Sequence, residues 1–141
     1  MHRTWTISIL FSLFFAQACT HVTAPTLYQK LGSADGIEHL VDALIQQIGH
    51  DPKVFHFFAE ANIDHFRHGL TQHFCAISDG PCQYSGDSMK DIHHGMHIKE
   101  ADFNHLVELL IQAMQQQNIA TPTQNQLLQR LAPLRQDILQ P

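Results

Sequence analysis

The sequence is short of positive charge and of strand-like patterns. Its 141 residues include 8 Lys and Arg against 13 Asp and Glu, which gives a formal net charge of −5. A chain without a basic face neutralises few phosphates, so no nucleic-acid partner is expected. No useful length of chain alternates apolar and polar residues, and no repeat has a solenoid period. With 44% hydrophobic residues, the chain is expected to form one all-α domain with its own core.

The N-terminal residues also lack a run long enough to span a bilayer as a mature helix. The stretch "MHRTW" supplies a positive start, and "ISILFSLFF" is a short apolar run. In the following "AQACT", Ala16 and Ala18 have the small-x-small cleavage pattern of a secretory signal. Cys19 comes next, as in a bacterial lipobox, although Ala16 occupies the position where Leu is usual.

These features predict a signal peptide over residues 1–18, a tether over 19–25 and a folded domain over 26–141. Two forms of export remain open: a lipoprotein that touches the membrane only through lipid on Cys19, and a soluble secreted protein. An ordinary buried N-terminal helix is a third, less favoured interpretation. Either form of export places the mature chain in the periplasm or the outer envelope of a bacterium.

Cysteine is scarce, with three residues in the chain. If Cys19 is acylated, Cys75 and Cys82 remain, on either side of the turn Asp79-Gly80-Pro81. That turn can bring the two sulfur atoms together, and an oxidising compartment then favours a disulfide. The alternative is a pair of reduced, buried thiols.

Four segments repeat apolar residues at spacings of three and four, which predicts amphipathic helices. They run from about residue 33 to 48, from 62 or 64 to 77, from 103 to 114, and from 121 to 138. Ser33 is expected to cap the first, and Thr121-Pro122 the last. Asn118 is expected to end the third, and Pro133 to kink the last.

The segments between these helices are shorter and less regular. Asp51-Pro52 predicts a cap and first helical residue, opening a short helix that carries Phe55, Phe57 and Phe58. Residues 79–88 are rich in Gly, Ser and Asp and predict a loop. A brief helix over 89–94, ended by Gly95, is expected to follow. Because a small helical protein rarely keeps such an irregular segment, we expect this region to be functional.

Histidine is abundant, with twelve residues, but metal-binding sets are hard to find among them. His65 and His68 share a helix face, yet no nearby acid or cysteine completes a tetrahedral zinc site. The cluster His93, His94 and His97 is more informative because it lies in the irregular segment. We expect it to lie opposite a helix lined by Phe66 and Leu70, the layout of an iron porphyrin held by one imidazole.

Several stretches together resemble the truncated haemoglobins, most closely group I. They are "LYQKLG", "FF" at 57–58, "GPCQYSGDSM", "IHHGMHI" followed by "ADF", and "LAPLRQDI", in family order and spacing. The resemblance covers almost all of the mature chain. It implies a truncated (2/2) globin-like helical sandwich around haem b.

The resemblance also implies the site residues. The family's proximal iron ligand corresponds to His93, which follows an aliphatic residue and precedes x-Gly. The other residues expected to contact haem are Ile45, Phe58, Phe66, Leu70, Tyr84, Met89, Leu106, Leu110 and Met114. Leu127 and Leu131 are expected to close the pocket from the last helix. Tyr84, Arg67 and Lys90 are candidate partners for the haem propionates.

The chain departs from the family on the gas-binding side. Ile45 occupies the position of a frequent Tyr, Leu70 that of a frequent Gln, and Phe66 the usual distal position. A donor that stabilises the charge on bound O₂ contributes about 1.5–3 kcal/mol. Without it, we expect a five-coordinate ferrous haem that favours CO and NO relative to O₂. Internal ligation by His65, His68 or His73 is less favoured.

These features predict a haem-binding globin for diatomic gases that scavenges NO or O₂ or has a redox role. No general base, nucleophile or flavin site indicates a dedicated reaction, so NO dioxygenase-like and peroxidase-like haem chemistry remain open. An electron donor is required for redox turnover, and the sequence does not identify it. The alternative is a haem-free, His-rich metal-binding lipoprotein of the envelope.

Overall fold

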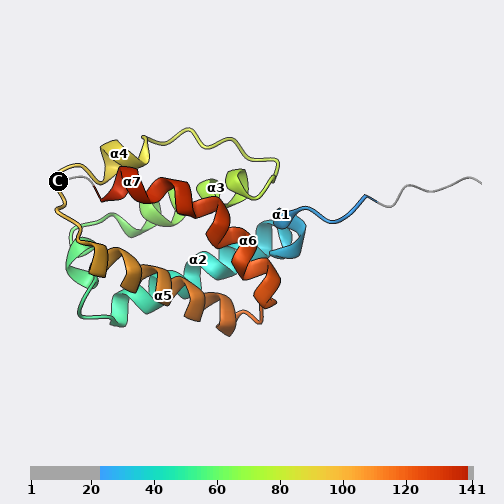
Figure 1. The fold of residues 1–141 in the computed structure, drawn as a ribbon, viewed down its shortest axis with the longest axis horizontal. Helices are drawn as coiled ribbons and strands as arrows, with labels where there is room; N and C mark the ends of the chain where they lie inside the picture. Colours follow the sequence, from blue (N-terminus) through green and yellow to red (C-terminus); the bar gives the residue numbers. More distant parts are fainter. Residues whose placement is uncertain (1–22, 140–141) are drawn as a thin grey trace, which may run out of the picture.

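The computed structural model describes residues 23–139, which form helices and connecting loops without strands (Figure 1). Within this range the long helices are α2 (Ser33–His50), α3 (Ile63–Ile77), α5 (Glu100–Gln116) and α6 (Thr121–Leu131). The short ones are α1 (Leu27–Lys30), η1 (Phe55–Phe57), α4 (Met89–Ile92), η2 (Ala132–Leu134) and α7 (Arg135–Ile138). The prediction of an all-α fold is therefore confirmed. Among the same residues, no helix combines the length and hydropathy that crossing a bilayer requires.

Three helix starts differ from the prediction. The short helix η1 begins at Phe55 after Val54, and not at Asp51-Pro52. Gly32, not Ser33, precedes α2, and its φ of 92° lies in the left-handed region that glycine tolerates. Ser33 is the first residue of the helix and itself has a φ of 60°. At the start of α6, Ala120 is the capping residue and Thr121 is already helical. The start of α2 also lies very close to the end of α1: a Cβ at Gly36 would lie 2.0 Å from the carbonyl oxygen of Leu31, so this position requires glycine.

Helix α1 was not predicted from the sequence. Thr26 and Gln29 form a capping box at its start, and Leu27 and the following Leu31 are both buried. The backbone N–H of Tyr28 donates to the carbonyl of Ser78, 2.7 Å away, which ties α1 to the end of α3. A single helical turn is too short to show a periodic apolar pattern, so periodicity could not identify it.

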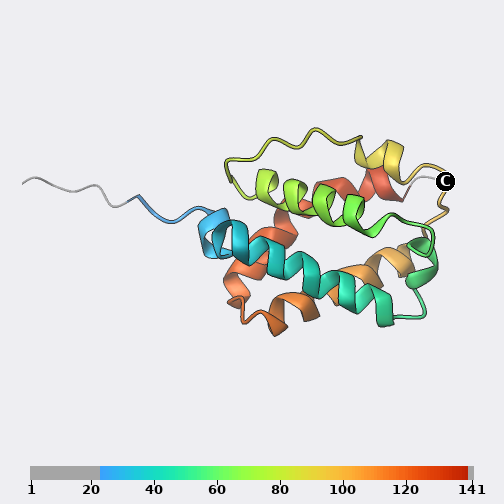
Figure 2. The ribbon, with the colours of Figure 1, turned by 180° about the vertical axis from the view of Figure 1, so that it is seen from behind.

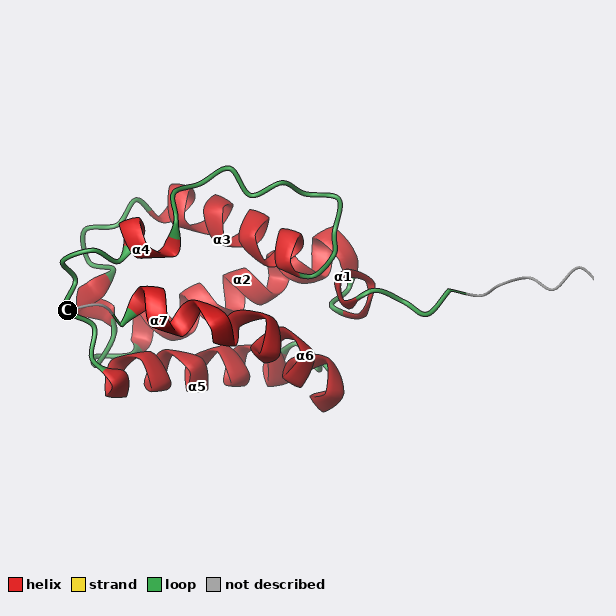
Figure 3. Cartoon of the chain, turned by 45° about the horizontal axis from the view of Figure 1, so that its top comes forward, coloured by secondary structure: helices red, strands yellow, loops and turns green. Residues whose placement is uncertain are grey.

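Helix α2 is central and packs against both α3 and α5 (Figures 2 and 3). The residues that this packing buries most completely are Ile37, Leu40, Val41, Ala113, Met114 and Leu127. Pro133 lies in η2, between α6 and α7, so the predicted kink in the last helix is confirmed. The bend brings α7 against α4 (Figure 1).

The loop over residues 79–88 leads from the end of α3 to α4, as predicted (Figure 1). Two contacts hold the first residues of this loop in place. The structure joins Cys75 to Cys82, with Cα atoms 5.8 Å apart, and Arg130 on α6 donates to Asp79 at 2.7 Å. Gly80 is required between them, because a Cβ there would lie 2.7 Å from the Cys75 carbonyl oxygen and from the ring of Tyr28.

Candidate functional site

His93 ends α4 and is half-buried. Its Nδ1 lies 2.7 Å from the carbonyl oxygen of Met89, one turn earlier. Because a carbonyl oxygen only accepts, Nδ1 must carry a proton and donate it, so in the neutral ring it is Nε2 that keeps a lone pair. This is the tautomer in which a neutral imidazole binds a metal through Nε2 while the hydrogen bond orients the ring.

The short helix that presents His93 is built by local contacts. The hydroxyl oxygen of Ser88 accepts from the backbone N–H of Asp91 at 3.2 Å, and the same hydroxyl donates to the Asp91 carboxylate at 2.6 Å. Gly95, with a φ of 77°, ends the turn. The helix is therefore shorter than the predicted 89–94, and His93 lies at its end.

The residues predicted to contact haem come from α2, α3, α4, α5 and the segments between them. They are Ile45 on α2, Phe58 after η1, Phe66 and Leu70 on α3, Tyr84 in the loop, Met89 and His93 at α4, and Leu106, Leu110 and Met114 on α5. Leu110 and Met114 are buried in the core, and the others are half-buried.

The half-buried members form an apolar wall. Ile45, Phe58, Phe66, Leu70 and Leu106 pack against the core on one side and remain partly uncovered on the other. The rings of Phe58 and Phe66 also contact each other, with centroids 5.1 Å apart. Large apolar side chains normally gain stability by full burial, so this wall suits a flat apolar group. An apolar wall and one metal-competent imidazole together fit an iron porphyrin.

The three candidate propionate partners differ in the groups that they contact. Tyr84 donates its hydroxyl to the carbonyl of Asp87 at 3.0 Å, and burial and the Asp87 charge raise the pKa of its phenol. Arg67 holds Asp42 of α2 through two hydrogen bonds, of 2.5 and 2.8 Å, which lower the pKa of that carboxyl. Arg67 therefore ties α3 to α2. Lys90 is exposed on α4.

The three histidines of α3 differ in burial. His65 and His68 are exposed, whereas His73 is buried against Phe74 and Tyr84, and burial lowers its pKa. Its Nε2 has no hydrogen-bond partner. In residues 23–139, no three His, Cys, Asp or Glu side chains come together as metal ligands. The geometry therefore does not favour the His-rich metal-binding alternative.

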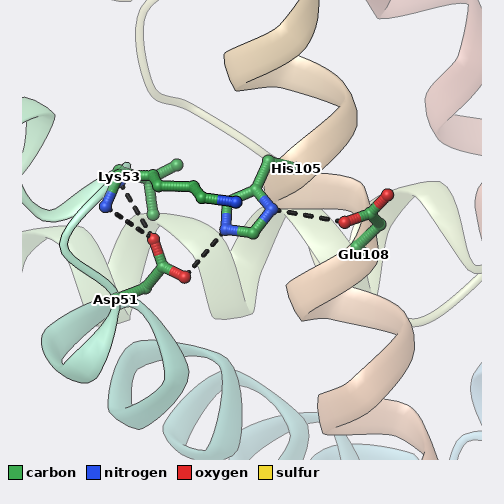
Figure 4. A network of polar contacts seen from close by, with 5 residues as sticks. Asp51, Lys53, His105 and Glu108 are labelled. Atoms are coloured by element: carbon green, nitrogen blue, oxygen red, sulfur yellow. Dashed lines mark hydrogen bonds and ion pairs between the residues drawn. The ribbon is translucent and has the colours of Figure 1, made fainter.

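Sequence reasoning missed one polar network, shown in Figure 4, which joins Asp51 after α2 to His105 and Glu108 on α5. The spacing of His105 and Glu108 was visible, but Asp51 lies 54 residues away in sequence. A separate groove of about 420 Å³ lies between α1, α2 and the α5–α6 turn, lined by residues such as Lys30, His39 and Asn118. It includes none of the residues predicted to contact haem.

Known proteins resemble this chain in sequence and in structure. The group 1 truncated haemoglobin of Tetrahymena pyriformis is 25% identical over 114 residues, which cover 81% of this chain and 94% of the relative. That of Nostoc commune is 27% identical over 114 residues, covering 81% and 97%. The crystal structure of the Tetrahymena pyriformis protein in its Fe(III) form superposes with a TM-score of 0.79, covering 83% of this chain and all of that one.

A structure at lower identity shows the same fold: the 2/2 haemoglobin of Synechococcus has a TM-score of 0.77 at 20% identity and covers 82% of this chain and 98% of that one. The sequence profile described as bacterial-like globin matches residues 26–140, nearly all of the part after the predicted tether. The chain therefore belongs to the bacterial-like globin family, and as a truncated globin it is a haem-iron protein for diatomic gases.

Proposed function

We propose that the chain binds haem b through His93 and the apolar wall of Ile45, Phe58, Phe66, Leu70 and Leu106, and that the iron of the bound haem would bind gases. The carrying observation is the hydrogen bond from Nδ1 of His93 to Met89, because it leaves Nε2 as a metal ligand. The haem supplies gas binding and one-electron chemistry when bound. The protein orients the imidazole and keeps water from the porphyrin faces.

The wall also supports a ligand preference. Ile45 on α2 and Phe66 and Leu70 on α3 carry no N–H or O–H in their side chains, so they offer a bound gas no hydrogen bond. A polar donor stabilises O₂ more than CO or NO, because O₂ takes more charge from the iron. We therefore propose that CO and NO are favoured relative to O₂, which suits NO scavenging or a redox role. A redox role also requires an electron donor.

We further propose that the protein is exported. The short apolar run, the pattern "AQACT" and Cys19 support a signal peptide over residues 1–18 and a lipid-bearing tether over 19–25, and they lie outside the described residues except for 23–25. A periplasmic or outer-envelope location would keep the bond between Cys75 and Cys82 oxidised.

Absorption spectra of the full chain with haemin test the proposal. We expect a Soret band in the ferric state and a shifted band in the ferrous state with CO. His93→Ala should lose the normal ferrous and CO bands, and added imidazole should restore them, because the free base replaces the missing ligand. The matched control is His94→Ala, which removes the exposed neighbouring histidine and should leave the spectra unchanged. Identical spectra for His93→Ala and the wild type would contradict the assignment.

A further inference from the structure

His105 on α5 is engaged at both ring nitrogens, as Figure 4 shows. Nε2 lies 2.7 Å from the carboxylate of Asp51, and Nδ1 lies 3.2 Å from that of Glu108. Ionised carboxylates only accept, so the ring donates at both positions only as an imidazolium. A neutral ring has one N–H and would turn a lone pair toward one of the two carboxylates.

Asp51 also forms hydrogen bonds with the segment that carries Phe58. Its other carboxylate oxygen accepts from the backbone N–H groups of Lys53 and Val54, at 2.9 and 3.1 Å. Its carbonyl accepts from the N–H of Phe55 at 3.0 Å, and the Phe55 carbonyl accepts from that of Phe58 at 2.9 Å. Val54 is buried in the core, which fixes the turn in place.

The other end of the contact lies on the helix that supplies Leu106. His105 directly precedes Leu106, which is half-buried against the core. The side chains of Asp51 and His105 are 16% and 19% exposed, whereas Glu108 is 66% exposed. The better-shielded ion pair, between Asp51 and His105, therefore links two parts of the apolar wall that come from distant parts of the sequence.

The charges around His105 set the direction of its pH response. The hydrogen bond from His105 lowers the pKa of Asp51 below its ordinary 3.8. The hydrogen bond to Asp51 raises the pKa of His105 above its ordinary 6.5, with a further contribution from Glu108 and opposition from burial and Lys53. The stabilisation that protonated His105 gives the folded chain is complete below pH 6.5 and is lost as pH rises through the raised pKa of His105. The stabilisation that ionised Asp51 gives is complete above pH 3.8 and is lost only at more acidic pH.

We propose that His105 is a positioning residue whose charge holds the Phe58 segment against α5, so that haem is retained more tightly at mildly acidic than at mildly alkaline pH. The inference rests on the proposed haem binding. It adds a pH dependence that originates in an ion pair between the turn after α2 and α5, and not at the proposed iron ligand.

Haem release tests this directly. The full chain loaded with haemin is mixed with excess apomyoglobin at pH 6 and at pH 9, and the transfer of haem is followed by absorbance. Wild-type release should be about two- to fivefold faster at pH 9, the size expected for loss of one partly exposed ion pair. His105→Gln should abolish the difference, because glutamine donates to Asp51 at every pH and does not titrate. His39→Gln, the same change at an exposed position of α2, should keep it.

A second measurement does not require haem. In the haem-free full chain, NMR titration of the His105 ring should give a midpoint above 6.5, and Asp51→Asn should lower it. Asp51→Asn also replaces His105→Gln in the release assay if that variant does not fold, since asparagine can still accept from Lys53 and Val54. An ordinary midpoint, a wild-type release rate independent of pH, or an unchanged pH difference in the variant would overturn the inference. A raised midpoint in a chain that binds no haemin would instead overturn the proposed function and leave the ion pair standing.

Discussion

One backbone carbonyl decides which nitrogen of a neutral His93 ring keeps its lone pair. Three histidines of this chain have three different chemistries because of their partners. The carbonyl of Met89 holds the proton of His93 on Nδ1, two carboxylates favour the doubly protonated form of His105, and burial favours the neutral form of His73. Residue type alone does not distinguish these cases. The contact of each ring nitrogen does.

At the same scale, a single donor should reverse the ligand preference. Leu70→Gln on α3 places an amide N–H on the proposed gas-binding side. A hydrogen bond of about 1.5–3 kcal/mol should slow O₂ release roughly 10–100-fold and change CO release much less. Stopped-flow displacement of O₂ and CO measures both rates. Leu70→Met, which keeps the position apolar, is the control. Equal O₂ release from Leu70→Gln and Leu70→Met would argue against a distal position for this residue.

At the scale of elements, each end of α3 is tied to other parts of the fold. Asn62 caps its start, accepting from the N–H of His65 at 3.0 Å. Arg67 binds Asp42 on α2, and the bond between Cys75 and Cys82 joins its last turns to the loop. These attachments fix the helix that carries Phe66 and Leu70 against α2 and the following loop. The helix thus keeps a partly uncovered apolar face without depending on full burial for its position.

The cap of α3 should make a measurable contribution to stability. Asn62→Ala removes the side-chain acceptor and leaves the His65 N–H without its partner, so the free energy of unfolding should fall by about 1 kcal/mol. Urea unfolding of the haem-free chain measures this as a lower midpoint with an unchanged slope. Asn62→Asp retains an acceptor and should stay close to the wild type. If the alanine variant were as stable as the aspartate variant, the cap would make no measurable contribution to the free energy of unfolding.

At the scale of the whole molecule, the core and the haem wall are distinct. The core forms where α2 packs against α3 and α5. The wall lies beside it and leaves apolar surface partly exposed. A ligand that binds only the folded chain adds stability in proportion to the logarithm of its concentration over its dissociation constant. Haem binding should therefore raise the free energy of unfolding of the chain.

The mass of the mature protein tests export and oxidation together. The full-length chain is produced in bacteria and purified from the envelope without reductant. We expect the purified protein to begin at Cys19 and to carry lipid. We also expect it to be lighter than the reduced protein by the two hydrogens lost in forming the Cys75–Cys82 bond. Mass spectrometry before and after reduction measures each feature. Cys19→Ser should abolish the lipid but keep the bond between the other two cysteines. A lipid-free chain that begins at Met1 with free thiols would contradict export.

The positions of the long helices followed from local pattern. Apolar spacing predicted α2, α3, α5 and α6, and Pro133 predicted the break before α7, because period and backbone restrictions act within a few residues. The resemblance of several stretches to truncated haemoglobins indicated the family. The assignment of His93 to the iron stays a prediction, now supported by the tautomer that its hydrogen bond imposes.

Only the tertiary structure decided the features that depend on residues far apart in sequence. Helix α1 is held by its bond to Ser78, Arg67 is paired with Asp42, His73 is buried, and His105 finds its partner 54 residues away. No local pattern encodes these contacts, because each arises only when packed helices bring the two groups together. The sequence by itself thus determined the long helices, their order and the family. The packing determined which nitrogens, charges and apolar faces remain available for chemistry.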